Sequence, residues 1–135
     1  NFEIGKAIEI LPGKDVVIFS CGNIISNCLE AALALKEKNI DCSVVNIHTI
    51  KPIDAEAILE KSKDKKLVIT VEEHNIIGGL GSAVAEVLSN ETLKCKLKRI
   101  GINDYYSSGG SYEYLKNIHG LSTEKIIQSI FSNID

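Results

Sequence analysis

The stretch Val71–Ala83 holds the most concentrated set of residues in this chain that could do chemistry. Two adjacent carboxylates, Glu72 and Glu73, and one imidazole, His74, follow directly after an apolar run. Because successive residues of a strand point to opposite faces, Glu72 and Glu73 form a poor general acid–base pair within this chain. At a domain interface, one of them could pair with a neighbouring cation. An isolated loop histidine such as His74 is more often a surface hydrogen-bonding group than a catalyst.

The same stretch enters a helix through three glycines, Gly78, Gly79 and Gly81, followed by Ser82. Glycines at a helix start leave backbone N–H groups open to an anion, and the helix dipole favours negative charge there. Alternatively, the glycines only form the turn and allow close packing, with Ser82 helping to cap the helix. A dinucleotide site is disfavoured, since Val84 stands where the third small residue of Gly-x-Gly-x-x-Gly belongs.

Further candidate residues follow two other predicted strands. His48 ends one of them and lies on the same ligand-binding edge of the sheet, where it could contact a partner domain. Tyr105 and Tyr106 occupy a polar loop after the last strand and could anchor an interface, or the loop could be a simple connection. The serines of that loop have no evident histidine and acid partners for a nucleophilic triad. His119 precedes Gly120 and is expected at a helix end.

These candidates must be positioned by short apolar runs that alternate with segments of helical period. The runs predict four strands: Val16–Ser20, Cys42–Ile47, Leu67–Val71 and Leu97–Ile102. The first three are nearly unbroken apolar runs, which predicts strands buried on both faces. The last contains Lys98 and Arg99, which places it nearer a sheet edge. Apolar residues at helical spacing predict four helices: Ile24–Lys38, Ala55–Ser62 (with Asp54 as N-cap), Gly79–Ser89 and Ser122 to about Asn133.

The first β-like run, Lys6–Leu11, precedes a Pro12-Gly13 turn and then the first long strand. This pattern suggests a hairpin whose first strand is antiparallel at the sheet edge. The whole predicts an α/β fold: a three-layer sandwich of about five mostly parallel strands, forming one domain over residues 1–135.

Composition excludes several classes of function. The net charge of −3 gives no basic surface for nucleic acid, and no apolar run is long enough to span a membrane. The four cysteines form no C-x-x-C pair and have no histidine at zinc spacing, which favours buried thiols in a reducing compartment, the cytoplasm. We predict no metal site. The absence of methionine indicates a processed chain or a piece of a longer one.

Taken together, five segments resemble, in order, the C-terminal domain of the transketolase family. These segments are Phe2–Ala7, Gly13–Gly22 (with Gly13-Lys14-Asp15-Val16), Asn46–Asp54 with its lysine-proline turn, Val71–Ser82 with its glutamates and glycines, and Gly101–Asp104 followed by Gly120-Leu121-Ser122. Within this resemblance, the segment Glu72-Glu73-His74-Asn75 favours transketolases, especially those split into two polypeptides. The alternatives are 1-deoxyxylulose-5-phosphate synthase and the β subunit of a 2-oxo acid dehydrogenase.

The resemblance implies a part of an enzyme that uses thiamine diphosphate and a divalent metal for two-carbon ketol transfer between sugar phosphates. The family's cofactor motif is missing from this sequence, so no catalytic or cofactor-binding residue is carried over, and the chain alone is expected to be inactive. Its implied partners are the cofactor-binding domains, in the same chain or a separate subunit, within a homodimer. A module that binds an anionic regulator is a further alternative.

Overall fold

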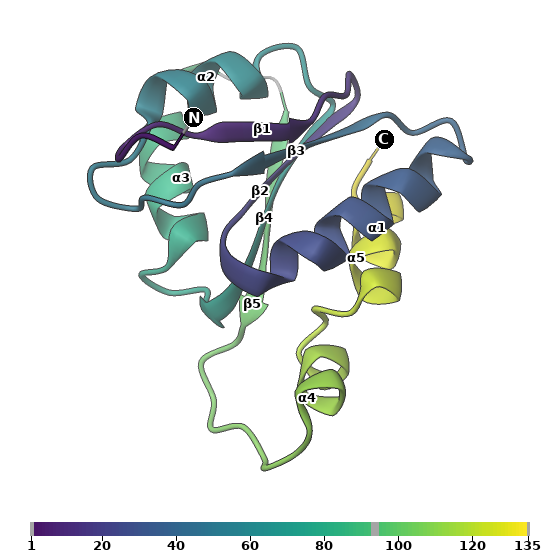
Figure 1. Ribbon diagram of the computed structural model, residues 1–135. Helices are drawn as coiled ribbons and strands as arrows, with labels where there is room; N and C mark the ends of the chain where they lie inside the picture. Colours follow the sequence, from purple (N-terminus) through teal and green to yellow (C-terminus); the bar gives the residue numbers. More distant parts are fainter. Residues whose placement is uncertain (1, 93–94, 135) are drawn as a thin grey trace.

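The computed structural model describes residues 2–92 and 95–134. In this part, a five-stranded sheet lies between two layers of helices, with strand order β1-β3-β2-β4-β5 (Figure 1). The strands are β1 (Ile8–Leu11), β2 (Val16–Ser20), β3 (Cys42–Asn46), β4 (Leu67–Asn75) and β5 (Lys96–Ile102). All neighbours pair in parallel except β1, which is antiparallel to β3. The predicted fold class is therefore confirmed.

The four predicted helices are all present, with ends within about two residues of the prediction. α1 (Ile25–Lys36), preceded by the 3₁₀ turn η1 (Gly22–Ile24), lies with α5 (Thr123–Phe131) on one face of the sheet. α2 (Ala55–Ser62) and α3 (Leu80–Leu88) cover the other face. None of the described helices is long and apolar enough to cross a bilayer.

The central strand β2 shows how the sequence fills both layers of the core. Val16 and Ile18 face α1 and α5, whereas Val17 and Phe19 face α2 and α3, and all four are completely buried. The period of two residues per repeat produces this alternation. A continuous apolar run is thus what a parallel strand covered on both faces requires.

The predicted hairpin at the start of the chain is wrong, although the antiparallel edge strand is confirmed. β1 pairs with β3 rather than β2, so the Pro12-Gly13 turn passes across the amino end of β3. A Cβ atom at Gly13 would lie only 2.2 Å from the carbonyl carbon of Cys42. The glycine is needed for this close backbone approach, which a turn dipeptide alone does not distinguish from a hairpin.

Asp54 caps α2 as predicted and also ties α2 to the start of the chain. Its carboxylate accepts hydrogen bonds from the Ala57 amide at 3.1 Å and from the Ala7 amide at 2.8 Å. Burial alone would raise the pKa of Asp54, but these two bonds outweigh burial and the pKa is lowered.

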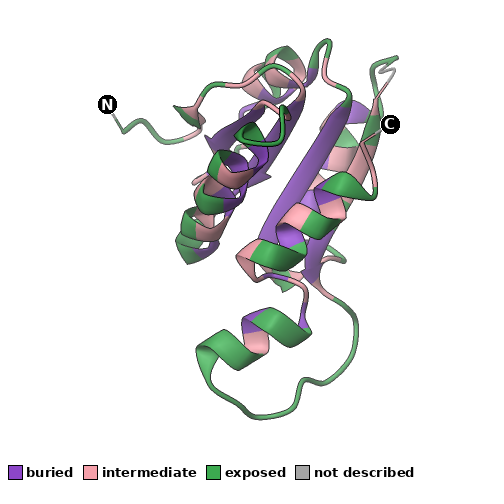
Figure 2. Cartoon of the chain, turned by 90° about the vertical axis from the view of Figure 1, so that its right-hand side faces the viewer, coloured by how far each residue is buried: buried purple, intermediate pink, exposed green. Residues whose placement is uncertain are grey.

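A fifth helix, α4 (Tyr112–Ile118), was not predicted from the sequence. It is short, and apart from Leu115 and Lys116 its side chains are exposed, so it lacks the apolar stripe that predicts longer helices. Ser111 caps it by accepting a hydrogen bond from the Tyr114 amide. The loop before α4 and the helix itself project from the sandwich, as Figures 1 and 2 show.

Candidate functional site

The carboxyl ends of the four parallel strands bring the predicted site residues to one edge of the sheet, which we call the carboxyl edge. His48 follows β3, the Glu72–Ser82 stretch spans the end of β4 and the start of α3, and Tyr105 and Tyr106 follow β5. The start of the chain also reaches this edge, because Ile8 of the antiparallel β1 lies opposite Asn46 at the end of β3.

Glu72 is the central polar residue of this edge, and it is only 1% exposed. Its two carboxylate oxygens accept hydrogen bonds from the first amides of α3, at 2.6 Å from Leu80 and 2.8 Å from Gly81. The carboxylate therefore compensates both the unpaired N–H groups and the positive end of the helix dipole. The glycine-rich helix start does bind an anion, and that anion belongs to the same chain.

The glycines make this arrangement possible by close approach. A Cβ atom at Gly79 would lie 1.9 Å from a Glu72 oxygen, and one at Gly81 would lie 2.7 Å from the Thr70 hydroxyl. Gly78 differs, because its φ of +80° is in the left-handed region and a Cβ would meet open space. An external anion at the Leu80 and Gly81 amides would have to displace Glu72, which weakens the prediction of an anion site at this helix start.

Glu73 points to the opposite face of β4, as the alternation of the strand predicts. It accepts a hydrogen bond of 2.5 Å from the Tyr112 hydroxyl of α4. This bond, together with burial, raises the pKa of Tyr112 to about 12, since the neutral phenol is the donor. The two glutamates are thus separated by the strand, and each holds a different helix.

The loop after β4 is organised by Ser82 and Arg99 from the α3 side of the sheet. Ser82 accepts from the Gly78 amide and donates to the Ile76 carbonyl, both at 3.0 Å. The Arg99 guanidinium donates to the same carbonyl at 3.0 Å and to Ser82 at 3.2 Å. His74 is exposed, and its Nδ1 lies 2.9 Å from the Asn75 carbonyl oxygen. Four hydrogen bonds from Ser82, Arg99 and Gly78 thus hold this turn.

His48 joins the carboxyl edge to the start of the chain. Its ring packs against Phe2 with centroids 4.4 Å apart, and its Nδ1 lies 2.9 Å from the Thr49 hydroxyl, which accepts from the Gly5 amide. Among the described residues, the buried Nε2 atom of His48 has no hydrogen-bond partner.

Tyr105 and Tyr106 take different places in the loop after β5. Tyr105 stacks on the His119 ring, and its hydroxyl lies 3.2 Å from Nδ1, while Ser107 lies 2.8 Å from Nε2. Tyr106 is completely exposed. His119 lies at a helix end as expected, at the C-cap of the unpredicted α4. Its contact with Ser107 was not predicted from the sequence.

The residues at the glycine-rich helix start can be compared with what a bound cofactor and its metal would need. The amides that could hold a pyrophosphate are bonded to Glu72. No group of three His, Cys, Asp or Glu side chains within residues 2–92 and 95–134 is placed to hold a metal ion. The residues present therefore fit neither thiamine diphosphate nor its metal, and no reaction step is derived through them.

The carboxyl edge is instead rich in exposed apolar side chains. Nine of the twelve large hydrophobic residues found exposed in the described part of the chain lie on segments at this edge. They are Phe2, Ile4, Ile50, Ile77, Tyr105, Tyr106, Tyr112, Tyr114 and Ile118. Such a concentration on one side is typical of a protein–protein or interdomain surface.

The fold and this edge together define a class of protein. It is a three-layer α/β domain with a buried carboxylate at a glycine-rich helix start and exposed apolar side chains along its carboxyl edge. The family of the transketolase C-terminal domain matches residues 5–126, and the chain belongs to that family.

Individual relatives agree with this assignment. A protein of Methanocaldococcus jannaschii assigned as a transketolase C-terminal section is 45% identical over 134 residues, covering 99% of this chain and 42% of that protein. A 1-deoxy-D-xylulose-5-phosphate synthase of Halothermothrix orenii is 38% identical, covering 98% of this chain and 21% of the synthase.

Among solved structures, a split-gene transketolase described as an inactive β4 tetramer superposes with a TM-score of 0.88 at 36% identity, covering 98% of this chain and 42% of that chain. The chain thus spans less than half the length of each of these relatives.

Proposed function

We propose that this chain is the C-terminal domain of a thiamine-diphosphate-dependent transketolase, and that its carboxyl edge packs against the domains that hold the cofactor. The observation that carries the proposal is the gathering of nine exposed hydrophobic side chains at that edge. Burying such side chains stabilises an assembly by roughly 25 cal/mol per Å² of apolar surface removed from water.

The partner surface should be apolar at its centre and polar at its rim. The aromatic residues of α4 and its loop supply large apolar area with hydroxyl groups, the usual composition of an interface core. Glu73 is partly exposed and His74 is exposed on the same edge, so both are available for hydrogen bonds or ion pairs with the partner.

In the complete enzyme, this domain would support a cytoplasmic homodimer that transfers a two-carbon ketol group between sugar phosphates. The cofactor, its divalent metal and the sugar phosphates would all be bound by the other domains. The relative from Halothermothrix orenii favours one specific second candidate, the same position in a 1-deoxyxylulose-5-phosphate synthase. In both enzymes the proposed role of the carboxyl edge is the same.

The test is reconstitution from two polypeptides. The chain and the cofactor-binding part of its native enzyme are purified separately, then mixed and assayed for a stable complex and for ketol transfer. We expect neither part to be active alone and the mixture to regain activity. Transfer by this chain alone, or tight binding of thiamine diphosphate to it, would overturn the proposal.

Two serine variants at exposed sites of similar type locate the surface. Ile77→Ser, at a side chain 64% exposed on the carboxyl edge, should weaken assembly by about tenfold if Ile77 is an anchor, because one buried anchor contributes more than about 1 kcal/mol. Leu33→Ser, at a side chain 57% exposed on α1, should leave assembly unchanged. Equal effects of the two variants would remove the carboxyl edge as the contact surface.

A further inference from the structure

A pocket of about 160 Å³ lies between α4 and the carboxyl end of the sheet. Its apolar walls are Leu115 of α4, Ile102 at the end of β5 and Leu121 just before α5. Ile102 and Leu121 belong to the core that α1 and α5 cover, so the pocket lies on the opposite face of the sheet from Glu72 and α3. Three separate segments thus form an apolar pocket at the base of the loop and helix that project from the sandwich (Figures 1 and 2).

The charged groups around this pocket are bonded within the chain. Glu73 accepts a hydrogen bond from the Tyr112 hydroxyl. Lys116 is only 8% exposed, forms an ion pair of 2.9 Å with Glu113 and donates to the Asn27 side chain of α1 at 3.3 Å. Its ammonium group also lies 4.7 Å from the centroid of the Tyr112 ring. A charged occupant would have to compete with these contacts, so the pocket suits an uncharged one.

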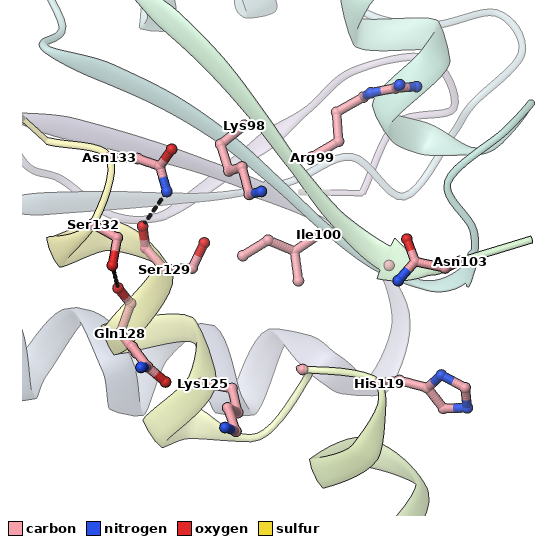
Figure 3. A pocket seen from close by; sticks show the side chains of 12 residues that line it. Lys98, Arg99, Ile100, Asn103, His119, Lys125, Gln128, Ser129, Ser132 and Asn133 are labelled. Carbon is pink, nitrogen blue, oxygen red and sulfur yellow. Dashed lines mark hydrogen bonds between the residues drawn. The ribbon is translucent and has the colours of Figure 1, made fainter.

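Among the described residues, His119 alone lines both this pocket and the larger groove between β5 and α5. Figure 3 shows the His119 side chain directed away from that groove, which Lys98 and Lys125 border. The His119 ring stacks on Tyr105, and its two nitrogens lie 3.2 Å from the Tyr105 hydroxyl and 2.8 Å from the Ser107 hydroxyl. The polar atoms of this histidine are therefore also engaged within the chain, and the two hollows differ in chemistry.

We infer that this pocket receives one apolar side chain, up to the size of phenylalanine, from the cofactor-binding domains. The inference rests on the proposed function, because it takes the carboxyl edge as the surface that meets those domains. The volume is close to that of an engineered apolar cavity of about 150 Å³ that binds benzene. Tyr112, Tyr114 and Ile118 are exposed on the same helix and extend the apolar surface around the pocket. A pocket filled by one buried side chain, with surrounding contacts that exclude water, is the usual form of an interface hot spot.

The first test is a titration of the ¹³C-methyl-labelled chain with toluene, which has the structure of the phenylalanine side chain. We expect saturable shifts of the methyl groups of Ile102, Leu115 and Leu121, and none at Leu33, an exposed leucine of α1 outside the pocket. No saturable shift at the pocket up to the solubility of toluene would overturn the inference. Tighter binding of acetate than of toluene would also overturn it, because the pocket would then be an anion site at Lys116.

The second test applies a matched pair of variants to the reconstitution assay. Leu115→Trp should fill the pocket and weaken assembly by about tenfold or more, since the partner's side chain can no longer enter. Leu33→Trp is the same substitution at the exposed leucine of α1 and should assemble like the parent chain. Circular dichroism and thermal unfolding confirm that each variant is folded. Equal assembly of both variants would refute the pocket and leave the proposed function intact, whereas failure of the parent chain to assemble would refute both.

Discussion

The Glu72 carboxylate offers the sharpest test of how this chain builds its glycine-rich turn. Glu72→Gln retains the shape of the side chain but replaces one oxygen by an NH₂ group. One of the two α3 amides, Leu80 or Gly81, would then face a donor instead of an acceptor. The substitution also removes the negative charge at the positive end of the helix.

The expected loss follows from these contacts. A hydrogen bond to a charged group contributes about 1.5–3 kcal/mol, and a buried donor without a partner costs about 1–3 kcal/mol. The lost interaction with the helix dipole adds roughly 0.3–1 kcal/mol. Removing a charge from a site only 1% exposed returns part of its desolvation cost. The net destabilisation should therefore be about 2–4 kcal/mol, a large share of the stability of a small domain.

Urea unfolding followed by far-UV circular dichroism measures this quantity from the shift in midpoint at unchanged slope. Glu73→Gln is the matched control, because it is the same substitution one residue later at a position that the structure leaves partly exposed. The control should lose at most about 1 kcal/mol, the value of one ordinary hydrogen bond. A loss below about 0.5 kcal/mol for Glu72→Gln, or equal losses for the two variants, would refute the assignment of Glu72 as the structural anion of α3.

Three other substitutions test separate contacts. Asp54→Ala should destabilise the chain by about 2–3 kcal/mol near neutral pH, as it removes a helix cap and a second amide acceptor. Because the folded pKa of Asp54 is lowered, this contribution is present above its unfolded value and is lost as pH falls through the folded value, so the variant and parent should converge in acid. Gly13→Ala should cost more than about 2 kcal/mol in thermal unfolding, since its Cβ would meet the Cys42 backbone, whereas Gly109→Ala meets nothing within 4 Å and should be near neutral. In an absorbance titration, one tyrosine should ionise only near pH 12, and Tyr112→Phe should remove that step; its persistence would contradict the Glu73 contact.

The strands and four helices were predictable because local patterns and the final packing agree. β2 is apolar at its first four positions, which are all completely buried, and α2 begins directly after Asp54, which caps it. The order of strands was less accessible, since the Pro12-Gly13 turn is compatible both with a hairpin and with a crossing over the end of β3. The pairing of β1 with β3 and the close approach of Gly13 to Cys42 separate these two paths, and both join segments far apart in the sequence.

The site was predictable in its location but only partly in its chemistry. The strand period correctly sent Glu72 and Glu73 to opposite faces, and the topology brought His48 and the tyrosine loop to the same edge. The sequence could not tell which anion the helix start holds, because a free helix start and one filled by Glu72 need the same glycines. The contact of Ser107 with His119 depends on α4, whose short and polar sequence lacks a periodic apolar face.

The hydrogen bonds that Glu72 accepts from the first amides of α3 change what the carboxyl edge can bind. A glycine-rich turn with free amides suits a phosphate, whereas a turn whose amides are bonded to a buried carboxylate has no free amides for one. Glu72 bonds to the start of α3 and Arg99 bonds to the Ile76 carbonyl, and Ile77 between these contacts is 64% exposed. A turn that is already held by hydrogen bonds loses less backbone entropy on association, which favours binding to a partner. The residues that resemble a ligand site in the sequence therefore act, in this fold, to hold the turn that carries the exposed Ile77.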